Sequence, residues 1–442
     1  MLTSSQNRPA DLVLRRARVV DPGAGTDEFV DVSIRQGRIA AIGHHLSAAP
    51  GQREVDADGL TVMPSFIDPH VHIRVPGGED VEDIASGTAA AARGGYGAIV
   101  SMPNTKPVVD SPEVLRALQR QASREAVIPI GFAAAISQGQ LGEQLAELCG
   151  LADAGAMLFT DDGLPVRSAA LLRRAFQYQL AARIPLALHC EDTELSAGGV
   201  MHEGAVSTML GFEGIPAASE SVAIARDVRI AASVAGARIH VQHVSCADSV
   251  EEIAWARACG VDVSAEAAPH HLLLTDEAAG SCDTNFKMNP PLRTAADREA
   301  LLEGVRNGTI DCIATDHAPH ARHLKEEPFE LAPFGVTGLE TAFASLYTGL
   351  VEPGHLALDR VVTAMTAGPA NVLGIPVPRV TVGAEANLAV FDLASVWTVD
   401  AADFRSKSDN SPFVGRRLRG QCVMTLAAGS VAWDTVATPV TA

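Results

Sequence analysis

The feature that most constrains the fold is an alternation of short apolar runs with helical segments through the middle of the chain. Eight runs follow Leu60, each nearly all apolar and ending in polar residues, which is typical of parallel strands buried on both faces. They read VMPSFIDPHVHIR, GAIVSMPN, VIPIGFAAAIS, GAMLFTDDG, IPLALHCED, RIHVQHVS, VDVSAEAAPHH and DCIATDHAPH. Segments of helical periodicity lie between them, for example residues 84–93, 168–182 and 217–234. Eight repeats of strand and helix predict an α/β protein with a (β/α)8 barrel of the TIM type, whose strand ends gather at one face.

The two ends of the chain have a different pattern. Residues 11–60 and 376–442 alternate apolar and polar side chains between glycines, as in LVLRRARVVDPG and VGAEANLAVFDL. This alternation is typical of short antiparallel strands, and we expect both ends to pair in one small β-sandwich beside the barrel. The sequence therefore predicts residues 1–61 and 376–442 for the sandwich and residues 62–375 for the barrel.

Composition argues against several classes of protein. Basic residues number 34 and acidic residues 53, so the net charge of −19 disfavours binding to nucleic acid or to an anionic membrane surface. No apolar run approaches the roughly 18 residues of a membrane span, and the first residues lack the pattern of a secretory signal. The seven cysteines include no CxxC pair, which fits reduced thiols. We therefore expect a cytoplasmic enzyme with a small-molecule substrate.

Polar residues at the ends of the expected strands are candidate metal ligands. His70 and His72 form an HxH pair at the end of the first strand, and alternation along a strand points both imidazoles to the same side. The other candidates end later strands: Asp162 the fourth, His189 the fifth, His243 the sixth and Asp316 the eighth. Imidazoles and carboxylates together suit zinc or a similar divalent ion.

Each of these features alone has a simpler interpretation. An isolated HxH pair is a weak motif, and TDDG is also a natural turn sequence, in which aspartate and glycine serve backbone geometry. The conjunction favours a metal site, because all six candidates fall at strand ends that meet around one barrel axis.

A set of motifs resembles one known family. The motifs are IDPHVHIR, SMPNT, FTDDG, HCED, HVS, PHHLLLTDE, FKMNPPLR, ATDHAPH and PFGVTGLET. Together they are similar to those of the class I type of dihydroorotase, in the amidohydrolase superfamily, over nearly the whole chain. The resemblance implies a barrel with a binuclear zinc centre that interconverts dihydroorotate and N-carbamoyl-L-aspartate in de novo pyrimidine biosynthesis.

The resemblance also implies how the metals are held. His70, His72 and Asp316 match the ligands of one zinc ion, and His189 and His243 match those of the second. Asp162 matches a carboxylate that bridges both ions together with a hydroxide. Many relatives use a carboxylated lysine as the bridge. This chain has no lysine at that position, since its lysines are Lys106, Lys287, Lys325 and Lys407.

Catalysis and substrate binding are assigned from the same motifs. Metal-bound hydroxide would be the nucleophile, and Asp316 would carry its proton to the departing amide nitrogen. Arg74 is expected to pair with the substrate carboxylate, although Val75 stands where the family often has an acidic residue. The other substrate contacts implied by the resemblance are His72, Asn104, Asn289, His320, Phe334 and Gly335. Asn104 is also a natural turn residue before Thr-Lys-Pro.

Two alternatives to an active dihydroorotase stay open from the sequence. The chain could be another cyclic-amide hydrolase, a hydantoinase, dihydropyrimidinase or allantoinase, or an inactive dihydroorotase-like scaffold for aspartate transcarbamoylase. The retained candidate ligands and Arg74 favour an active dihydroorotase, expected as a homodimer with aspartate transcarbamoylase as a further possible partner. His270 and His271 could orient metal ligands or be structural, and segment 318–337 could close over the substrate or be surface decoration.

Overall fold

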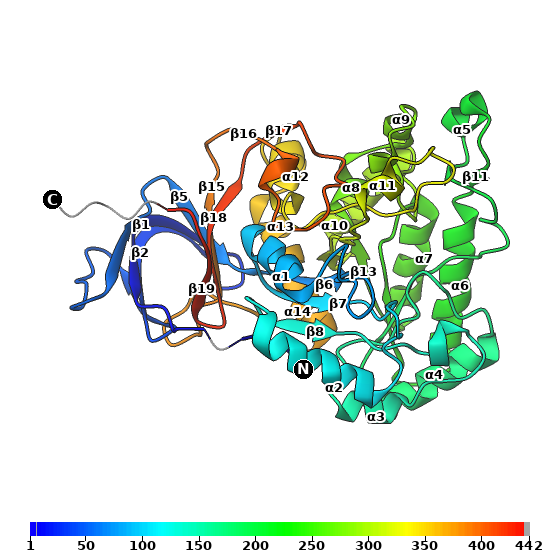
Figure 1. Ribbon diagram of the computed structural model, residues 1–442, viewed down its shortest axis with the longest axis horizontal. Coiled ribbons are helices and arrows are strands. Elements are labelled where there is room, and N and C mark those ends of the chain that lie inside the picture. Colours follow the sequence, from blue (N-terminus) through cyan, green and yellow to red (C-terminus); the bar gives the residue numbers. More distant parts are fainter. Residues whose placement is uncertain (6, 437–442) are drawn as a thin grey trace.

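The computed structural model describes residues 1–5 and 7–436 and has two parts. Figure 1 shows a β-rich part at one end of the molecule and a larger part in which helices surround strands. Residue 6 and residues 437–442, which belong to the expected sandwich segments, lie outside the described residues. None of the helices in the described part of the chain combines the length and apolar character that crossing a bilayer requires.

The larger part is built on two parallel sheets. One contains β6 (Phe66–Val71), β7 (Tyr96–Ser101) and β8 (Ile130–Phe132); the other contains β9 (Leu186–Leu188), β12 (Arg238–Val241), β13 (Asp262–Ala267) and β14 (Cys312–Ile313). Nearly every residue of these strands is buried, as the apolar runs predict.

Single-residue bridges join the two sheets into a closed ring. Phe159 bridges Ala134 on one side and Leu186 on the other, and Val71 bridges His317, all in parallel orientation. The eight expected runs therefore surround one axis in chain order, and the fold class is confirmed.

The fourth run differs from a full strand. Its one bridging residue is Phe159, and backbone hydrogen bonds join the run to both neighbours, among them Thr160 N to Ala134 O (2.9 Å) and Ala187 N to Phe159 O (2.8 Å). After Thr160 a side chain takes over the pairing, because the Asp161 carboxylate accepts hydrogen bonds from the backbone nitrogens of Ile136 (2.8 Å) and Ser137 (3.0 Å).

Helices follow most of these strands. The longer ones are α1 (Ile84–Arg93), α2 (Pro112–Glu125), α4 (Ala169–Ala182), α6 (Ala218–Ala232), α7 (Ala247–Ala258), α10 (Ala295–Asn307) and α13 (Leu358–Met365). Shorter ones are α3 (Leu148–Asp153), α5 (Ala205–Leu210), α8 (Pro269–Leu273), α9 (Asp276–Ala279), α11 (Arg322–Lys325), α12 (Ala342–Leu346) and α14 (Ala367–Leu373). The three helical segments expected from the sequence are confirmed to within two residues at each end.

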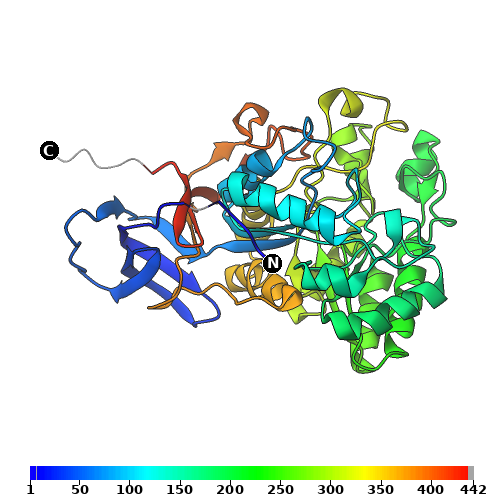
Figure 2. The ribbon, with the colours of Figure 1, turned by 60° about the horizontal axis from the view of Figure 1, so that its bottom comes forward.

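Both ends of the chain contribute to one eight-stranded sheet. Its strands are β1 (Leu12–Asp21), β2 (Thr26–Arg35), β3 (Arg38–Gly43), β4 (Arg53–Asp56), β5 (Leu60–Pro64), β15 (Leu388–Asp392), β18 (Gln421–Ala427) and β19 (Ser430–Asp434). Strand β5 pairs with β1 and also with β15, so β5 joins the two ends. Figure 2 shows these strands, blue and red, on one side of the barrel. The domain boundaries at 61/62 and 375/376 stay predictions, and β5 spans the first of them.

An aromatic cluster joins the terminal sheet to the barrel. Phe66 starts the first barrel strand, Phe391 lies on β15 and Phe343 lies on α12, and all three are almost fully buried. The ring centroids of Phe343 and Phe391 are 4.3 Å apart, and Phe66 lies 5.2 Å from Phe343 and 5.4 Å from Phe391. This packing fixes the start of β6 against the terminal sheet, at the opposite end of that strand from His70.

Replacing Phe391 by alanine is predicted to lower the free energy of unfolding by about 3–5 kcal/mol, because it leaves a cavity at this junction. The matched control is Phe29→Ala on β2, where the side chain is 63% exposed and the expected change is within about 0.5 kcal/mol. Chemical denaturation of the two variants measures both effects. Equal transitions would contradict the structural role of the cluster.

Candidate metal centre and active site

The candidate ligands lie where the barrel strands end, and several occupy strained backbone conformations. Asp162, His243 and Asp316 have φ angles of 47°, 32° and 48°, in the left-handed region that residues other than glycine rarely adopt. Local hydrogen bonds hold these turns: the backbone nitrogen of Asp162 donates to Thr160 Oγ1 at 2.8 Å, and that of His243 donates to Glu266 Oε1 at 3.3 Å. The left-handed turns at these three residues direct their side chains toward the barrel axis.

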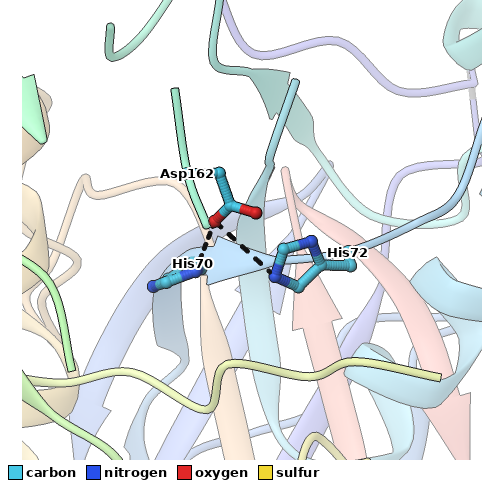
Figure 3. A group of neighbouring side chains, drawn as sticks. All are labelled: His70, His72 and Asp162. Atoms are coloured by element: carbon cyan, nitrogen blue, oxygen red, sulfur yellow. Dashed lines mark ion pairs between the residues drawn. The ribbon is translucent and has the colours of Figure 1, made fainter. Parts of the chain in front are cut away.

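Four of the candidates meet in one group. His70, His72 and Asp162 offer ligand atoms that all lie within 4.8 Å of one another, and Figure 3 shows both imidazoles facing the Asp162 carboxylate. Asp162 Oδ1 is 3.5 Å from His70 Nε2 and 3.9 Å from His72 Nε2. Asp316 Oδ1 joins them, 3.1 Å from His72 Nε2 and 3.5 Å from His70 Nε2.

The other two candidates form an adjoining pair. His189 Nδ1 lies 2.8 Å from His243 Nε2, so two ring nitrogens face each other. The His243 ring centroid is 5.4 Å from that of His70, which makes the pair continuous with the first group. The structure thus brings all six expected ligands together.

Two charged carboxylates dominate the electrostatics of the group. Burial raises the pKa values of Asp162 and Asp316, but the histidine charges around them outweigh it, and both pKa values lie far below the usual range. Burial and the neighbouring His189 lower the pKa of His243 to about 3, so this imidazole is neutral and has a lone pair to share. Ionised carboxylates and a neutral imidazole are the protonation states that bind a metal.

Two glutamates orient the imidazoles from outside the group. Glu266 Oε1 accepts from His70 Nδ1 at 2.6 Å and Glu266 Oε2 lies 2.9 Å from His240 Nε2, while Glu191 Oε2 is 2.7 Å from His189 Nε2. The sequence analysis missed both glutamates. The signal for Glu266 was available, because it is a charged residue within the apolar run VDVSAEAAPHH.

The tautomer of His70 tests whether this group fits a metal. Against the effect of burial, the nearby carboxylates raise the pKa of His70, and because Nδ1 donates to Glu266, a metal would displace the proton from Nε2, which is buried and has no hydrogen-bond partner among the described residues. That nitrogen faces Asp162 and Asp316. Carboxylate-bound histidines with a free second nitrogen are characteristic of metal ligands, so the donor set fits a divalent ion.

A cavity of about 290 Å³ opens onto the ligands. Its lining includes every site residue expected from the sequence except His70, which is buried beneath it. The lining residues are His72, Arg74, Asn104, Asp162, Gly163, His189, His243, Asn289, Asp316, Ala318, His320, Phe334 and Gly335. A cavity of this size suits a small molecule.

Arg74 is the positive charge of the cavity. Its Nε donates to the carbonyl oxygen of Pro319 at 3.1 Å, and in residues 1–5 and 7–436 its terminal guanidinium nitrogens meet no hydrogen-bond acceptor. Burial lowers the pKa of Arg74, while Asp162 and Asp316 oppose that effect, so the guanidinium stays charged. The Arg74 guanidinium therefore has free N–H donors that could bind an anion.

The other side chains expected to bind the substrate already form hydrogen bonds with protein groups. Asn104 Nδ2 donates to Asp162 Oδ2 at 2.5 Å and its Oδ1 lies 3.0 Å from His72 Nδ1, so the amide holds two candidate ligands. Asn289 Nδ2 donates to Glu191 Oε2 at 2.9 Å. His320 Nε2 donates to the carbonyl oxygen of Phe334 at 2.7 Å.

Two buried lysines anchor the segment that carries Phe334 and Gly335. Lys287 Nζ donates to the carbonyl oxygens of Phe329 (2.6 Å) and Glu330 (3.0 Å), and lies 4.6 Å from the ring centre of Phe334. Lys325 Nζ donates to the carbonyl oxygens of Pro333 (3.1 Å) and Gly335 (3.0 Å). The segment 318–337 is thus tied down beside the cavity, and its closure over a substrate stays a prediction.

The paired histidines after the seventh strand differ from each other. His271 Nε2 donates to the carbonyl oxygen of Pro290 at 2.9 Å, which is a structural contact. His270 Nε2 is buried with no recorded partner among the described residues, and burial and His271 lower the pKa of His270 well below its ordinary value.

Comparisons with known proteins agree with this site. A family model described as dihydro-orotase-like matches residues 59–249. A dihydroorotase from Pelotomaculum thermopropionicum is 49% identical over 422 residues, covering 95% of this chain and 98% of the relative. A dihydroorotase from Solibacter usitatus is 44% identical over 423 residues, covering 96% of this chain and 98% of the relative.

Solved structures resemble this protein over nearly its whole length. An L-hydantoinase (dihydropyrimidinase) from Arthrobacter aurescens has a TM-score of 0.86 at 28% identity and covers 98% of both chains. A D-hydantoinase from Bacillus sp. AR9 has a TM-score of 0.81 at 26% identity, with coverage of 96% of this chain and 95% of the other. Both comparisons support the barrel fold.

Removing the charge of Glu266 tests the metal interpretation. Glu266→Gln is predicted to weaken metal binding by about 10–100-fold, because His70 loses the carboxylate that fixes its tautomer and raises its basicity. Glu251→Gln, an exposed change on α7, is the control and should leave the affinity unchanged. Chelator competition measures both dissociation constants, and equal values would exclude the role assigned to Glu266.

Lys287→Met is predicted to loosen segment 326–335, because two hydrogen bonds from a charged donor, each contributing about 1.5–3 kcal/mol, are lost while the apolar stem is kept. Amide hydrogen exchange of that segment should become faster. Lys407→Met removes a partly exposed ion pair with Asp83 and should leave the segment unchanged. Identical exchange in both variants would argue against the anchor.

Proposed function

The chain belongs to the dihydroorotase family, and on that premise we propose that it interconverts (S)-dihydroorotate and N-carbamoyl-L-aspartate. It is a hydrolase of cyclic amides, placed by its relatives in pyrimidine biosynthesis. The observation that best supports this substrate is Arg74, whose free guanidinium donors share one cavity with the candidate metal ligands. A small molecule with a carboxylate and a cyclic amide would place the carboxylate at Arg74 and the amide at the candidate metal ligands.

We propose that the bound metal is zinc, with two ions per chain. His70, His72 and Asp316 would hold one ion and His189 and His243 the other, with Asp162 and a hydroxide shared between them. Bound there, the ions would supply a nucleophile by lowering the pKa of water to about 7 and would polarise the amide carbonyl. The unpartnered His70 Nε2 supports the first site, and the facing nitrogens of His189 and His243 support the second.

Asp316 is the proposed proton carrier. Its pKa lies far below the usual range because His70 and His72 offset its burial, so it starts as a proton acceptor. It lies at the floor of the cavity beside His72 Nε2. In hydrolysis it would take the proton of the attacking water and give it to the amide nitrogen, and in ring closure the transfer runs in reverse.

The substrate carboxylate is assigned to Arg74, with Asn104 and His320 beside it. Burial and the charge of Arg74 lower the pKa of His320 to about 3, so its imidazole is neutral. Its Nε2 hydrogen is given to Phe334, which makes Nδ1 an acceptor. A His320 contact to the carboxylate therefore requires release of that bond, whereas Arg74 is ready to donate. Asn289, Phe334 and Gly335 are proposed to contact the ring amide edge.

A hydantoinase activity is the second candidate, favoured by the solved structures of that name. Two features argue against it. The ammonium groups of Lys287 and Lys325 are bound to backbone carbonyls of the anchored segment, so neither supplies a bridging carbamate. A neutral ring would also leave the charge of Arg74 without a partner in a partly buried site, which is unfavourable.

We further propose that the enzyme works in the cytoplasm as a homodimer and that it can associate with aspartate transcarbamoylase. All seven cysteines are free thiols in the structure, which supports a reducing compartment. The oligomeric state and the partner are proposals carried over from the family resemblance.

Turnover of dihydroorotate by the zinc-loaded chain, with hydantoin and allantoin alongside, tests the function. Dihydroorotate should be hydrolysed and the neutral rings should not. In Arg74→Met the value of kcat/KM should fall by roughly 30- to 1000-fold, the equivalent of about 2–4 kcal/mol for an unpaired buried charge.

The matched control is Arg116→Met, which removes an exposed arginine from α2 and should keep full activity. Preference for hydantoin or allantoin, or an unchanged kcat/KM in Arg74→Met, would contradict the assigned substrate. Loss of all activity in both arginine variants would indicate a folding defect, which their thermal transitions would reveal.

A further inference from the structure

A second cavity, of about 320 Å³, lies outside the barrel mouth and shares no lining residue with the active-site cavity. Helices α8, α10 and α12 form its walls together with the stretch from Phe413 to Leu418, which includes β17 (Arg417–Leu418). Three of its lining residues are arginines: Arg298 on α10, and Arg416 and Arg417 from the C-terminal stretch.

None of the three arginines is neutralised by the protein. Across residues 1–5 and 7–436, no carboxylate forms an ion pair with Arg298, Arg416 or Arg417, although acidic residues outnumber basic ones by 53 to 34 in the chain. The Nε atom of Arg298 is buried and has no hydrogen-bond partner in that part of the chain. A buried donor without a partner is unfavourable, so Arg298 has unused hydrogen-bonding capacity at this cavity.

The one acidic residue on the cavity wall is already paired. Glu299 Oε1 accepts from Arg306 NH1 at 2.9 Å, and the same nitrogen pairs with Glu303 at 3.2 Å, so Glu299 is bonded to an arginine outside the cavity lining. Three arginines and one glutamate give the cavity lining a formal charge of +2, within a protein whose net charge is −19. Local positive charge of this kind attracts anions against the global field.

The remaining wall is mixed, with polar Ser345, Thr348 and His355 beside apolar side chains. Leu302, Leu350 and Phe413 line the cavity, and the Arg416 guanidinium lies 5.7 Å from the Phe413 ring centre. A free inorganic anion would use the arginines alone, whereas a molecule with an apolar part would also cover these side chains. Planar guanidinium forks match phosphate oxygens in pairs.

We propose that this cavity is a binding site for a small organic phosphate, in size and chemistry a nucleoside monophosphate. The phosphoryl group binds to Arg298, Arg416 and Arg417, and the apolar part packs on Leu302 and Phe413. The site is independent of the reaction assigned to the metal centre.

Isothermal titration calorimetry on the full-length, zinc-loaded enzyme tests the proposal. The probes are AMP and UMP, their parent nucleosides, and inorganic phosphate. Each monophosphate should bind once per chain, and the uncharged nucleosides should not bind. Arg298→Met should weaken monophosphate binding at least tenfold while dihydroorotate turnover is retained. The double variant Arg416→Met/Arg417→Met, which changes two exposed side chains, should do the same and remains informative if Arg298→Met folds poorly.

The control is again Arg116→Met, which should bind as the unaltered chain does. Inorganic phosphate binding as tightly as AMP and UMP, with the same loss in the variants, would support the anion site and identify free phosphate as its ligand. Absence of saturable binding, or binding that both variants leave unchanged, would overturn the proposal. So would binding that competes with dihydroorotate and is insensitive to Arg298→Met, because the anion would then lie at the metal centre.

Discussion

The burial of three ionised carboxylates, Asp162, Asp316 and Glu266, at one end of the barrel is the constraint on which the rest of the structure depends. All three pKa values are held far below the usual range although burial alone would raise them. An isolated buried carboxylate costs several kcal/mol, so the site is stable only with positive charge close by. Imidazoles provide part of that charge, and metal ions would provide the rest.

The same constraint explains the local backbone. Left-handed φ angles at Asp162, His243 and Asp316 are unfavourable, and they persist because side chains such as Thr160 and Glu266 hold the neighbouring amide groups. Farther out, Lys287 and Lys325 fix the segment that shapes the cavity. The aromatic cluster of Phe66, Phe343 and Phe391 holds the terminal sheet against the barrel.

Much of the fold was predictable from the sequence because a parallel barrel strand leaves a strong signal. Apolar runs that end in polar residues marked all eight barrel positions, and the ligand candidates stood at their ends. The fourth run was harder to predict, since it is apolar like the others but forms only a bridge at Phe159. After Thr160 its backbone pairing gives way to hydrogen bonds from Ile136 and Ser137 to the Asp161 carboxylate, which depend on tertiary contacts.

The roles around the ligands were less predictable than the ligands themselves. Asn104 and His320 were expected to face the substrate, yet each is bonded to protein groups, Asn104 to His72 and Asp162 and His320 to Phe334. Glu191 is separated from Asn289 by almost a hundred residues, so its contact with that amide has no local sequence signal. Such contacts follow from how distant loops converge, which periodicity and motifs do not encode.

Anomalous diffraction at the zinc absorption edge, from crystals of the zinc-loaded enzyme, tests the central claim most directly. The account predicts two peaks per chain at the barrel mouth, one beside His70, His72 and Asp316 and the other beside His189 and His243, with the Asp162 carboxylate between them. A single peak, or peaks away from these side chains, would contradict a binuclear centre bridged by Asp162.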